Sequence, residues 1–174
     1  MKKILVYSGS NSSRSINQRL AEYAGSLAGD FPVTVIKLTD YKIPLYSEDM
    51  EREGFPEGVK DLYSLIRSHD GLIISVPEHN GSLPAFFKNI LDWLSRYERS
   101  FLSGIKVFVM STSPGERGGQ SSREAAINLL PRFKGEVAGS FSLSFFGKNF
   151  SNRITDNEKD RELGNLIKQF CEDL

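Results

Sequence analysis

The sequence predicts one α/β domain, built as a three-layer, doubly wound parallel sheet of five strands. Short runs rich in β-branched residues alternate with longer amphipathic stretches about five times along the 174 residues. Two of the short runs, Gly71–Val76 and Ile105–Ser111, are continuously apolar, which is typical of strands buried on both faces by helices. No repeat, low-complexity tract or linker interrupts the pattern, so we expect a single domain over residues 1–174.

The first half of the chain predicts strands at Ile4–Ser8 and Val33–Leu38, where apolar and β-branched residues cluster. Between them, Ile16–Ala28 carries apolar residues at three-to-four spacing, which predicts a helix. The stretch Asp40–Gly58 is rich in proline, glycine and charge, so we expect a loop there. Val59–Ser68 then predicts a helix that turns Leu62, Leu65 and Ile66 inward, ahead of the buried strand Gly71–Val76.

The second half predicts three more helices, at Pro84–Arg96, Gln120–Phe133 and Asn157–Leu174, with a last strand at Gly135–Ser144. In the helix that starts at Pro84, Phe86 and Trp93 lie seven residues apart and share one face. That face is either core or a contact with a partner subunit. Lys88 and Asp92, four residues apart, are placed to form an ion pair.

Composition narrows the possible classes of protein. The 22 basic and 22 acidic residues cancel, which argues against the broad cationic surface that nucleic-acid binding requires. The single cysteine, Cys171, excludes an intramolecular disulfide and falls in the terminal helix, where we expect it to pack. No apolar run approaches the ~20 residues that span a bilayer. We therefore expect a cytoplasmic protein with no membrane partner and no metal site.

Three predicted loops follow the first, third and fourth strands, at the edge where open α/β sheets bind ligands. Their sequences are GSNSSRSIN from Gly9, PEHNGS from Pro77 and TSPGERGG from Thr112. The first leads into a helix N-terminus, where free N–H groups and the helix dipole favour an anion such as a phosphate monoester. The hydroxyls of Ser10 and Ser15 and the amide of Asn17 would add donors. The same residue types are also the preferred helix caps, so an ordinary polar turn is the alternative.

Several phosphate-binding motifs are absent. The first loop has only Gly9 of a G-x-G-x-x-G fingerprint, and no G-x-x-x-x-G-K-[ST] string occurs in the chain. The remote position of Cys171 excludes a cysteine-based phosphatase, and two histidines without a cysteine cluster make a structural zinc site improbable.

The second and third loops have the composition of walls around a flat ligand. The Pro77 loop can present backbone N–H and C=O groups to a heterocycle, and His79 could stack on it or remain an exposed loop histidine. Glu78 is more suited to a solvated or capping role than to proton transfer. Gly115, Gly118 and Gly119 allow close backbone approach to a ligand, or form a flexible connection.

Two motifs resemble those of the NAD(P)H-dependent FMN reductases with a flavodoxin-like fold, a family that includes chromate and azo-dye reductases. The family motif G-S-x-R-x-x-S-x-N-x-x-L-A is matched by Gly9-Ser10, Ser15, Asn17 and Leu20-Ala21. The motif P-E-Y-N-x-S-x-P-x-x-L-K-N-x-x-D-W is matched by PEHNGSLPAFFKNILDW, residues 77–93. The stretch LTDYKIPLY from Leu38 and the G-x-x-G-G loop at Gly115–Gly119 are also similar. Two departures matter: the family's early arginine falls at Ser12, with Arg14 two residues later, and His79 replaces a tyrosine.

The resemblance implies a strand order of 2-1-3-4-5, bound FMN, and electron transfer from NADPH or NADH to a quinone, azo compound, metal oxyanion or free flavin. The flavin carries that chemistry, so no residue is expected to act as a catalytic acid, base or nucleophile. It also implies a homodimer or homotetramer. The cofactor-binding residues that it implies are Gly9, Ser10, Arg14, Ser15, Ile16, Asn17, Pro77, Glu78, His79, Asn80, Gly81, Ser111, Thr112, Gly115, Gly118 and Gly119.

Two other functions fit the same fold. One is a flavodoxin-like electron carrier, which usually needs an acidic docking surface that the zero net charge does not favour. The other is a flavin-binding regulatory domain without reductase activity, because a fold does not dictate a function.

Overall fold

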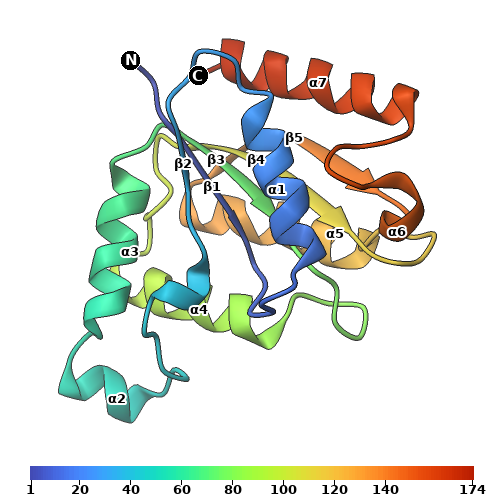
Figure 1. Cartoon of the computed structure of the whole chain (residues 1–174). Coiled ribbons are helices and arrows are strands. Elements are labelled where there is room, and N and C mark those ends of the chain that lie inside the picture. The colour runs from blue at the N-terminus through green and yellow to red at the C-terminus, as the bar shows by residue number, and fades with distance from the viewer.

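A computed structural model describes all residues from 1 to 174, and it confirms the predicted three-layer α/β architecture (Figure 1). Five parallel strands form one sheet in the order β2-β1-β3-β4-β5, as the resemblance implied. The strands are β1 (Ile4–Ser8), β2 (Val33–Val35), β3 (Gly71–Ser75), β4 (Lys106–Thr112) and β5 (Glu136–Leu143). β2 ends earlier than predicted because it is a short edge strand with one neighbour, and the chain turns away after Ile36 into a 3₁₀ turn, η1 (Leu38–Asp40).

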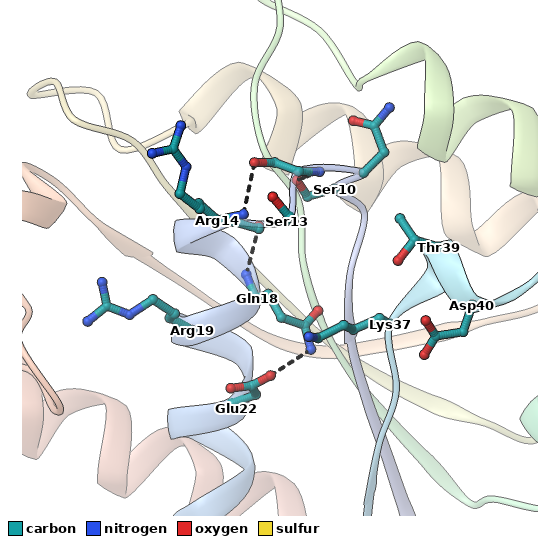
Figure 2. Close-up of a pocket in the computed structure, with 12 residues that line it drawn as sticks. Ser10, Ser13, Arg14, Gln18, Arg19, Glu22, Lys37, Thr39 and Asp40 are labelled. Atoms are coloured by element: carbon teal, nitrogen blue, oxygen red, sulfur yellow. Dashed lines mark hydrogen bonds between the residues drawn. The ribbon is translucent and has the colours of Figure 1, made fainter.

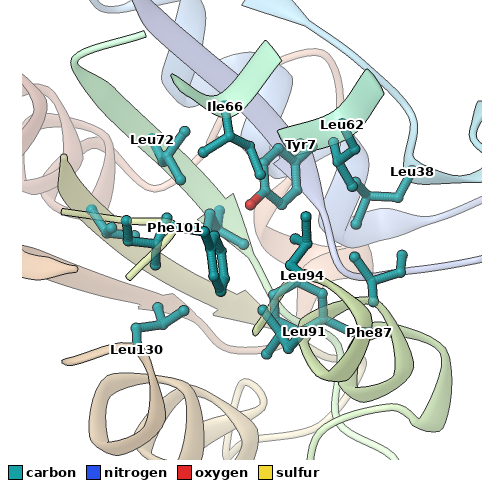
Figure 3. Packing of buried hydrophobic residues seen from close by; sticks show 14 of the residues in the cluster. Tyr7, Leu38, Leu62, Ile66, Leu72, Phe87, Leu91, Leu94, Phe101 and Leu130 are labelled. Carbon is teal, nitrogen blue, oxygen red and sulfur yellow. The ribbon is translucent and has the colours of Figure 1, made fainter. Parts of the chain in front are cut away.

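Helices cover both faces of the sheet, which explains the uninterrupted apolar runs of the central strands. On one face, Ile4 and Val6 of β1 belong to the cluster formed with α1 (Ile16–Ser26) and α7 (Asn157–Glu172). On the other, Leu5 and Tyr7 belong to the cluster formed with α3 (Glu57–Arg67), α4 (Ala85–Tyr97) and α5 (Gln120–Leu129). Figure 3 shows this second core, with Tyr7 between Ile66, Leu62 and Leu94. Its apolar surroundings raise the pKa of the Tyr7 hydroxyl.

Two predicted segments are divided differently in the structure. The stretch 120–133, predicted as one helix, is α5 followed by the 3₁₀ turn η2 (Leu130–Phe133), because Pro131 has no N–H to continue the α-helical ladder. The stretch 40–58, predicted as loop, contains α2 (Glu48–Glu53), a six-residue helix capped by Ser47. α2 buries none of its residues, so it left no apolar periodicity in the sequence. A four-residue helix, α6 (Phe146–Asn149), was likewise not predicted.

The segment around α2 is fastened to α4, and this decides the role of Trp93. Trp93 is fully buried, donates its indole N–H to the Pro44 carbonyl at 2.8 Å, and meets the Tyr46 ring edge-on. Asn89 adds bonds to the backbone of Pro44 and Tyr46. Trp93 therefore belongs to the core of its own chain rather than to a subunit contact.

Other side chains of the helices lie where the sequence predicted them. The Lys88–Asp92 ion pair forms at 2.6 Å. Cys171 is buried as a packing residue in α7. None of the helices has both the length and the apolar character needed to cross a bilayer.

The topology brings three loops to one edge. β1, β3 and β4 are adjacent and parallel, so the loops that follow them leave from the same carboxyl edge of the sheet. The chain order reverses at β1, which has β2 on one side and β3 on the other, and such a switch point is where open α/β sheets bind ligands.

Candidate functional site: a groove between three loops

The three loops at the carboxyl edge enclose a groove of about 210 Å³, called here the loop groove. Every loop contributes to it, so segments far apart in the sequence form one site. Its lining residues are Ser10, Ser12, Arg14, Ser15, Ile16, Asn17, Pro77, Glu78, His79, Thr112, Ser113 and Pro114. Ser12 was not among the predicted site residues. Ser113 and Pro114 were predicted only as part of the third loop, and their position directly after β4 was the signal that could have identified them individually.

The loop after β1 is shaped by its own serines. The hydroxyl oxygens of Ser8, Ser10 and Ser12 each accept the backbone N–H two residues further on, at 3.2, 3.1 and 3.2 Å. Ser15 then caps α1 by accepting the Gln18 N–H at 3.1 Å. These hydroxyls hold the loop in place, as in an ordinary polar turn, and those of Ser10, Ser12 and Ser15, which line the groove, can still donate their own hydrogens to a ligand.

The first turn of α1 nevertheless leaves anion-binding groups free. The backbone N–H groups of Ile16 and Asn17 have no acceptor within the chain, and the turn contains no acidic residue. Arg14 forms no ion pair and lines the same groove. Unpaired N–H groups at the positive end of a helix, with a guanidinium alongside, are suited to an anion.

Asn17 has a different role from the one expected. Its side chain is 2% exposed, and its oxygen accepts the Ser75 hydroxyl at 2.7 Å and the Thr112 N–H at 3.0 Å. Its NH₂ donates to the Thr112 carbonyl at 3.1 Å. The expected use of this amide as a phosphate donor is corrected accordingly: the amide joins α1 to the ends of β3 and β4. What remains for a ligand is the Asn17 backbone N–H.

The loop after β3 is a tight hairpin. His79 and Ser82 exchange two backbone hydrogen bonds, of 3.0 and 3.1 Å, around Asn80 and Gly81, which both have positive φ. Asn-Gly is the residue pair that such a turn favours. His79 is exposed and lines the groove, whereas Asn80 and Gly81 form the tip outside it.

Glu78 caps a helix from a distance. One of its carboxylate oxygens accepts the backbone N–H groups of Ser121 and Ser122, at 2.8 and 3.3 Å, in the first turn of α5. This confirms a capping role rather than proton transfer. It also means that α5, unlike α1, has no free N–H groups in its first turn to offer a ligand.

Most of the predicted glycine-loop contacts are replaced by internal packing. Gly118 and Gly119 are buried. A Cβ on Gly118 would lie 2.4 Å from Ser142 Oγ, and a Cβ on Gly119 would lie 3.0 Å from Ser111 Cβ. Ser111 is itself fully buried and donates to the Gly118 carbonyl at 2.7 Å. Ser111, Gly118 and Gly119 do not line the groove. Gly9, which packs on Phe87, and Gly115, which is exposed, do not line it either. Gly9, Ser111, Gly118 and Gly119 therefore give the loops their shape, and the end of the loop after β4 packs against β4 and β5 through Gly118 and Gly119.

A second hollow, of about 490 Å³, lies beside α1 and shares Ser10, Ser12, Arg14 and Ser15 with the groove (Figure 2). It is lined by both signs of charge, with Lys37 accompanied by Glu22 and Asp40. Arg19 is turned toward the Ser151 carbonyl and the rings of Phe146 and Phe150. In Figure 2 the Arg14 guanidinium points away from Thr39 and Asp40. Ile16 and Asn17, whose backbone N–H groups are free, line the loop groove and not this hollow, so the groove is better suited to an anion although the hollow is larger.

Comparison with known proteins gives a consistent assignment. The family model for NADPH-dependent FMN reductase matches residues 2–147. An uncharacterized protein from Mycoplasma pneumoniae is 32% identical over 164 residues, which cover 90% of this chain and 97% of that protein. The quinone reductase of Escherichia coli K12 is 34% identical over 128 residues, covering 73% of this chain and 64% of that enzyme.

Solved structures agree with this family. The flavoenzyme NAD(P)H:acceptor oxidoreductase FerB from Paracoccus denitrificans superposes with a TM-score of 0.80 at 26% identity, covering 99% of this chain and 96% of that one. The match of the family model across both loop motifs and most of the sheet is decisive: the chain belongs to the NADPH-dependent FMN reductase family.

Proposed function

We propose that this protein binds FMN in the loop groove, accepts a hydride from NADPH or NADH, and passes the electrons to a small organic acceptor. The observation that carries the proposal is the pair of free backbone N–H groups, of Ile16 and Asn17, facing a groove that three loops enclose. When bound, the flavin supplies the hydride and electron chemistry, and the protein supplies placement and electrostatics.

The phosphate end of FMN fits the first turn of α1. The Ile16 and Asn17 N–H groups would bind phosphate oxygens, with hydrogens from the Ser10 and Ser15 hydroxyls. Arg14 would neutralise part of the phosphate charge in place of the arginine that the resembling motif carries at Ser12. A carboxylate in this turn would oppose binding, and α1 has none there.

The ring end fits between the other two loops. Pro77 and His79 would contact one edge of the isoalloxazine, and Ser113 and Pro114 the opposite side. The groove is smaller than the ~300–1,000 Å³ usual for ligand pockets, so part of the flavin would remain open to solvent. An open ring face is what a flavin needs in order to meet a pyridine nucleotide and then an acceptor in turn.

We propose quinones as the first acceptors to test, because the Escherichia coli relative is named a quinone reductase. Azo compounds, metal oxyanions and free flavin are the further classes. The homodimer or homotetramer expected from the resemblance belongs to the same proposal, and sedimentation velocity of the FMN-loaded protein would measure it.

The test has two stages. Purified protein desalted after addition of FMN should remain yellow, and loss of all colour would contradict the cofactor assignment. Anaerobic NADPH or NADH should then bleach the flavin absorbance within seconds, and a quinone should restore it. A protein that holds FMN but is not bleached by either nucleotide would instead be an electron carrier reduced by another enzyme.

A further inference from the structure

The Glu78 carboxylate connects the two loops that form the walls of the groove. Glu78 belongs to the hairpin loop after β3. It accepts the N–H groups of Ser121 and Ser122, which lie in the first turn of α5, the helix that follows the loop after β4. α5 has no side-chain cap of its own, because its N-cap position is Gly119. Glu78 therefore supplies from another loop the acceptor that a helix N-terminus needs.

A second contact joins the same two segments. The fully buried Ser122 donates its hydroxyl to the Val76 carbonyl at 3.3 Å, at the start of the hairpin loop, and to the Gly119 carbonyl at 3.0 Å. The first turn of α5 thus donates three hydrogen bonds to residues 76–78, two to the Glu78 side chain and one to the Val76 backbone. A shift of one loop would strain or break these bonds unless the other moved with it.

We propose that Glu78 is a positioning residue that fixes the spacing between the two walls of the groove and offsets the positive end of the α5 dipole beside it. This inference rests on the proposed function, since it takes a flavin to lie between those walls. The carboxylate acts through α5 and through the hairpin. The role proposed here is structural, because one carboxylate oxygen accepts both N–H groups of α5.

Hydrogen bonding and charge can be separated by two substitutions. Glu78→Gln keeps an amide oxygen that accepts the same N–H groups but removes the negative charge. Glu78→Ala removes both. Glu124→Gln is the matched control, because Glu124 is an exposed carboxylate on α5 that bonds only to the Gln120 side chain.

Amide hydrogen exchange on the FMN-free protein tests the connection itself. In Glu78→Ala, the amides of Ser121, Ser122, His79 and Ser82 should exchange about tenfold faster or more, because the cap and the hairpin it anchors are both released. Glu78→Gln should largely restore protection, and Glu124→Gln should match the wild type. Unchanged exchange at the hairpin amides in Glu78→Ala would overturn the inference, whatever the protein binds.

FMN titration and redox potentiometry test the consequence. Glu78→Ala should raise the FMN dissociation constant about tenfold, and Glu78→Gln by less than about threefold. Both should shift the midpoint potential of the bound flavin to more positive values, since reduction adds charge that a carboxylate opposes. Wild-type affinity and potential in Glu78→Ala would overturn the positioning role while leaving the proposed function intact. Absence of FMN binding by the wild type would instead refute the proposed function, and the exchange data would still decide whether Glu78 couples the loops.

Discussion

Asn17 and Thr112 are joined by two hydrogen bonds although 95 residues separate them in the chain. The Asn17 oxygen accepts the Thr112 N–H and its NH₂ donates to the Thr112 carbonyl, so one amide satisfies both backbone groups of a residue at the end of β4. The same oxygen accepts the Ser75 hydroxyl at the end of β3. The beginning of α1 is thereby fixed to two strands of the sheet, and with it the free N–H groups of the groove.

Replacing Asn17 by alanine should destabilise the protein by about 2–3 kcal/mol, because buried donors and acceptors on Thr112 and Ser75 lose their partners. Urea unfolding followed by circular dichroism measures this. Asn128→Ala, at an exposed position on α5, is the control and should change the free energy of unfolding by less than about 0.5 kcal/mol. Equal effects of the two substitutions would show that the Asn17 contacts contribute little.

Two substitutions at Ser15 should separate capping from phosphate binding. Ser15→Ala removes the N-cap of α1 and should cost about 1 kcal/mol of stability. Ser15→Asp keeps a good cap, so stability should be close to that of the wild type. Its charge beside the phosphate position should nevertheless weaken FMN binding about tenfold or more.

Riboflavin, which lacks the phosphate, is the control ligand for the Ser15 variants. Fluorescence titration should show that Ser15→Asp changes riboflavin affinity much less than FMN affinity. Equal losses for both ligands would place the phosphate somewhere other than the first turn of α1.

Two glycines of the same loop should respond differently to alanine. At Gly118, where φ is +56°, a Cβ would lie 2.4 Å from Ser142 Oγ, so Gly118→Ala should lose about 1–2 kcal/mol from the left-handed backbone alone and more from the clash. At Gly115 the nearest atom to a Cβ would be 3.9 Å away, so Gly115→Ala should be nearly neutral for stability. Thermal unfolding of the two variants side by side measures the difference. Equal melting temperatures would contradict the close packing of Gly118 on β5.

Acid should release the segment around α2 from α4. Hydrogen bonds from Arg96, and secondly from Tyr46, hold the pKa of Glu51 below its usual 4.5. Because the folded-state pKa is the lower one, this contribution is present above pH about 4.5 and is lost as pH falls through the folded value. Trp93 is the only tryptophan and packs on Tyr46 and Phe55 of this segment, so its fluorescence reports the release.

Glu51→Gln is the comparison for the acid titration. The variant should show an altered Trp93 signal already at pH 7 and a smaller change between pH 6 and 3 than the wild type, because the group that titrates is gone. Arg96→Gln should also reduce the change, because Glu51 still titrates but loses the partner that lowers its pKa most. Identical titration curves for all three proteins would mean that other carboxylates control the release.

The sequence by itself determined the layers of this protein and the edge at which its site lies. Continuous apolar runs identify strands buried on both faces, and alternation with helices makes the sheet parallel, which brings the loops after β1, β3 and β4 to one edge. The free N–H groups at Ile16 and Asn17 also follow from local chain order, because any helix start leaves such groups. The sequence predicted the long helices that have an apolar face, but it did not predict α2, because α2 buries none of its residues.

Only the tertiary structure decided what each polar side chain of those loops does. Asn17, Glu78 and Ser111 are the same residue types whether they face a ligand or hold another loop. The hydrogen-bond partners that decide these roles are distant in the chain: Ser121 lies 43 residues from Glu78, and Thr112 lies 95 residues from Asn17. Gly118 is similar, because its packing against Ser142 of β5 depends on how two strands align. Local sequence specifies which groups can form hydrogen bonds, but the folded chain sets which of them are already bonded and which remain free for a ligand.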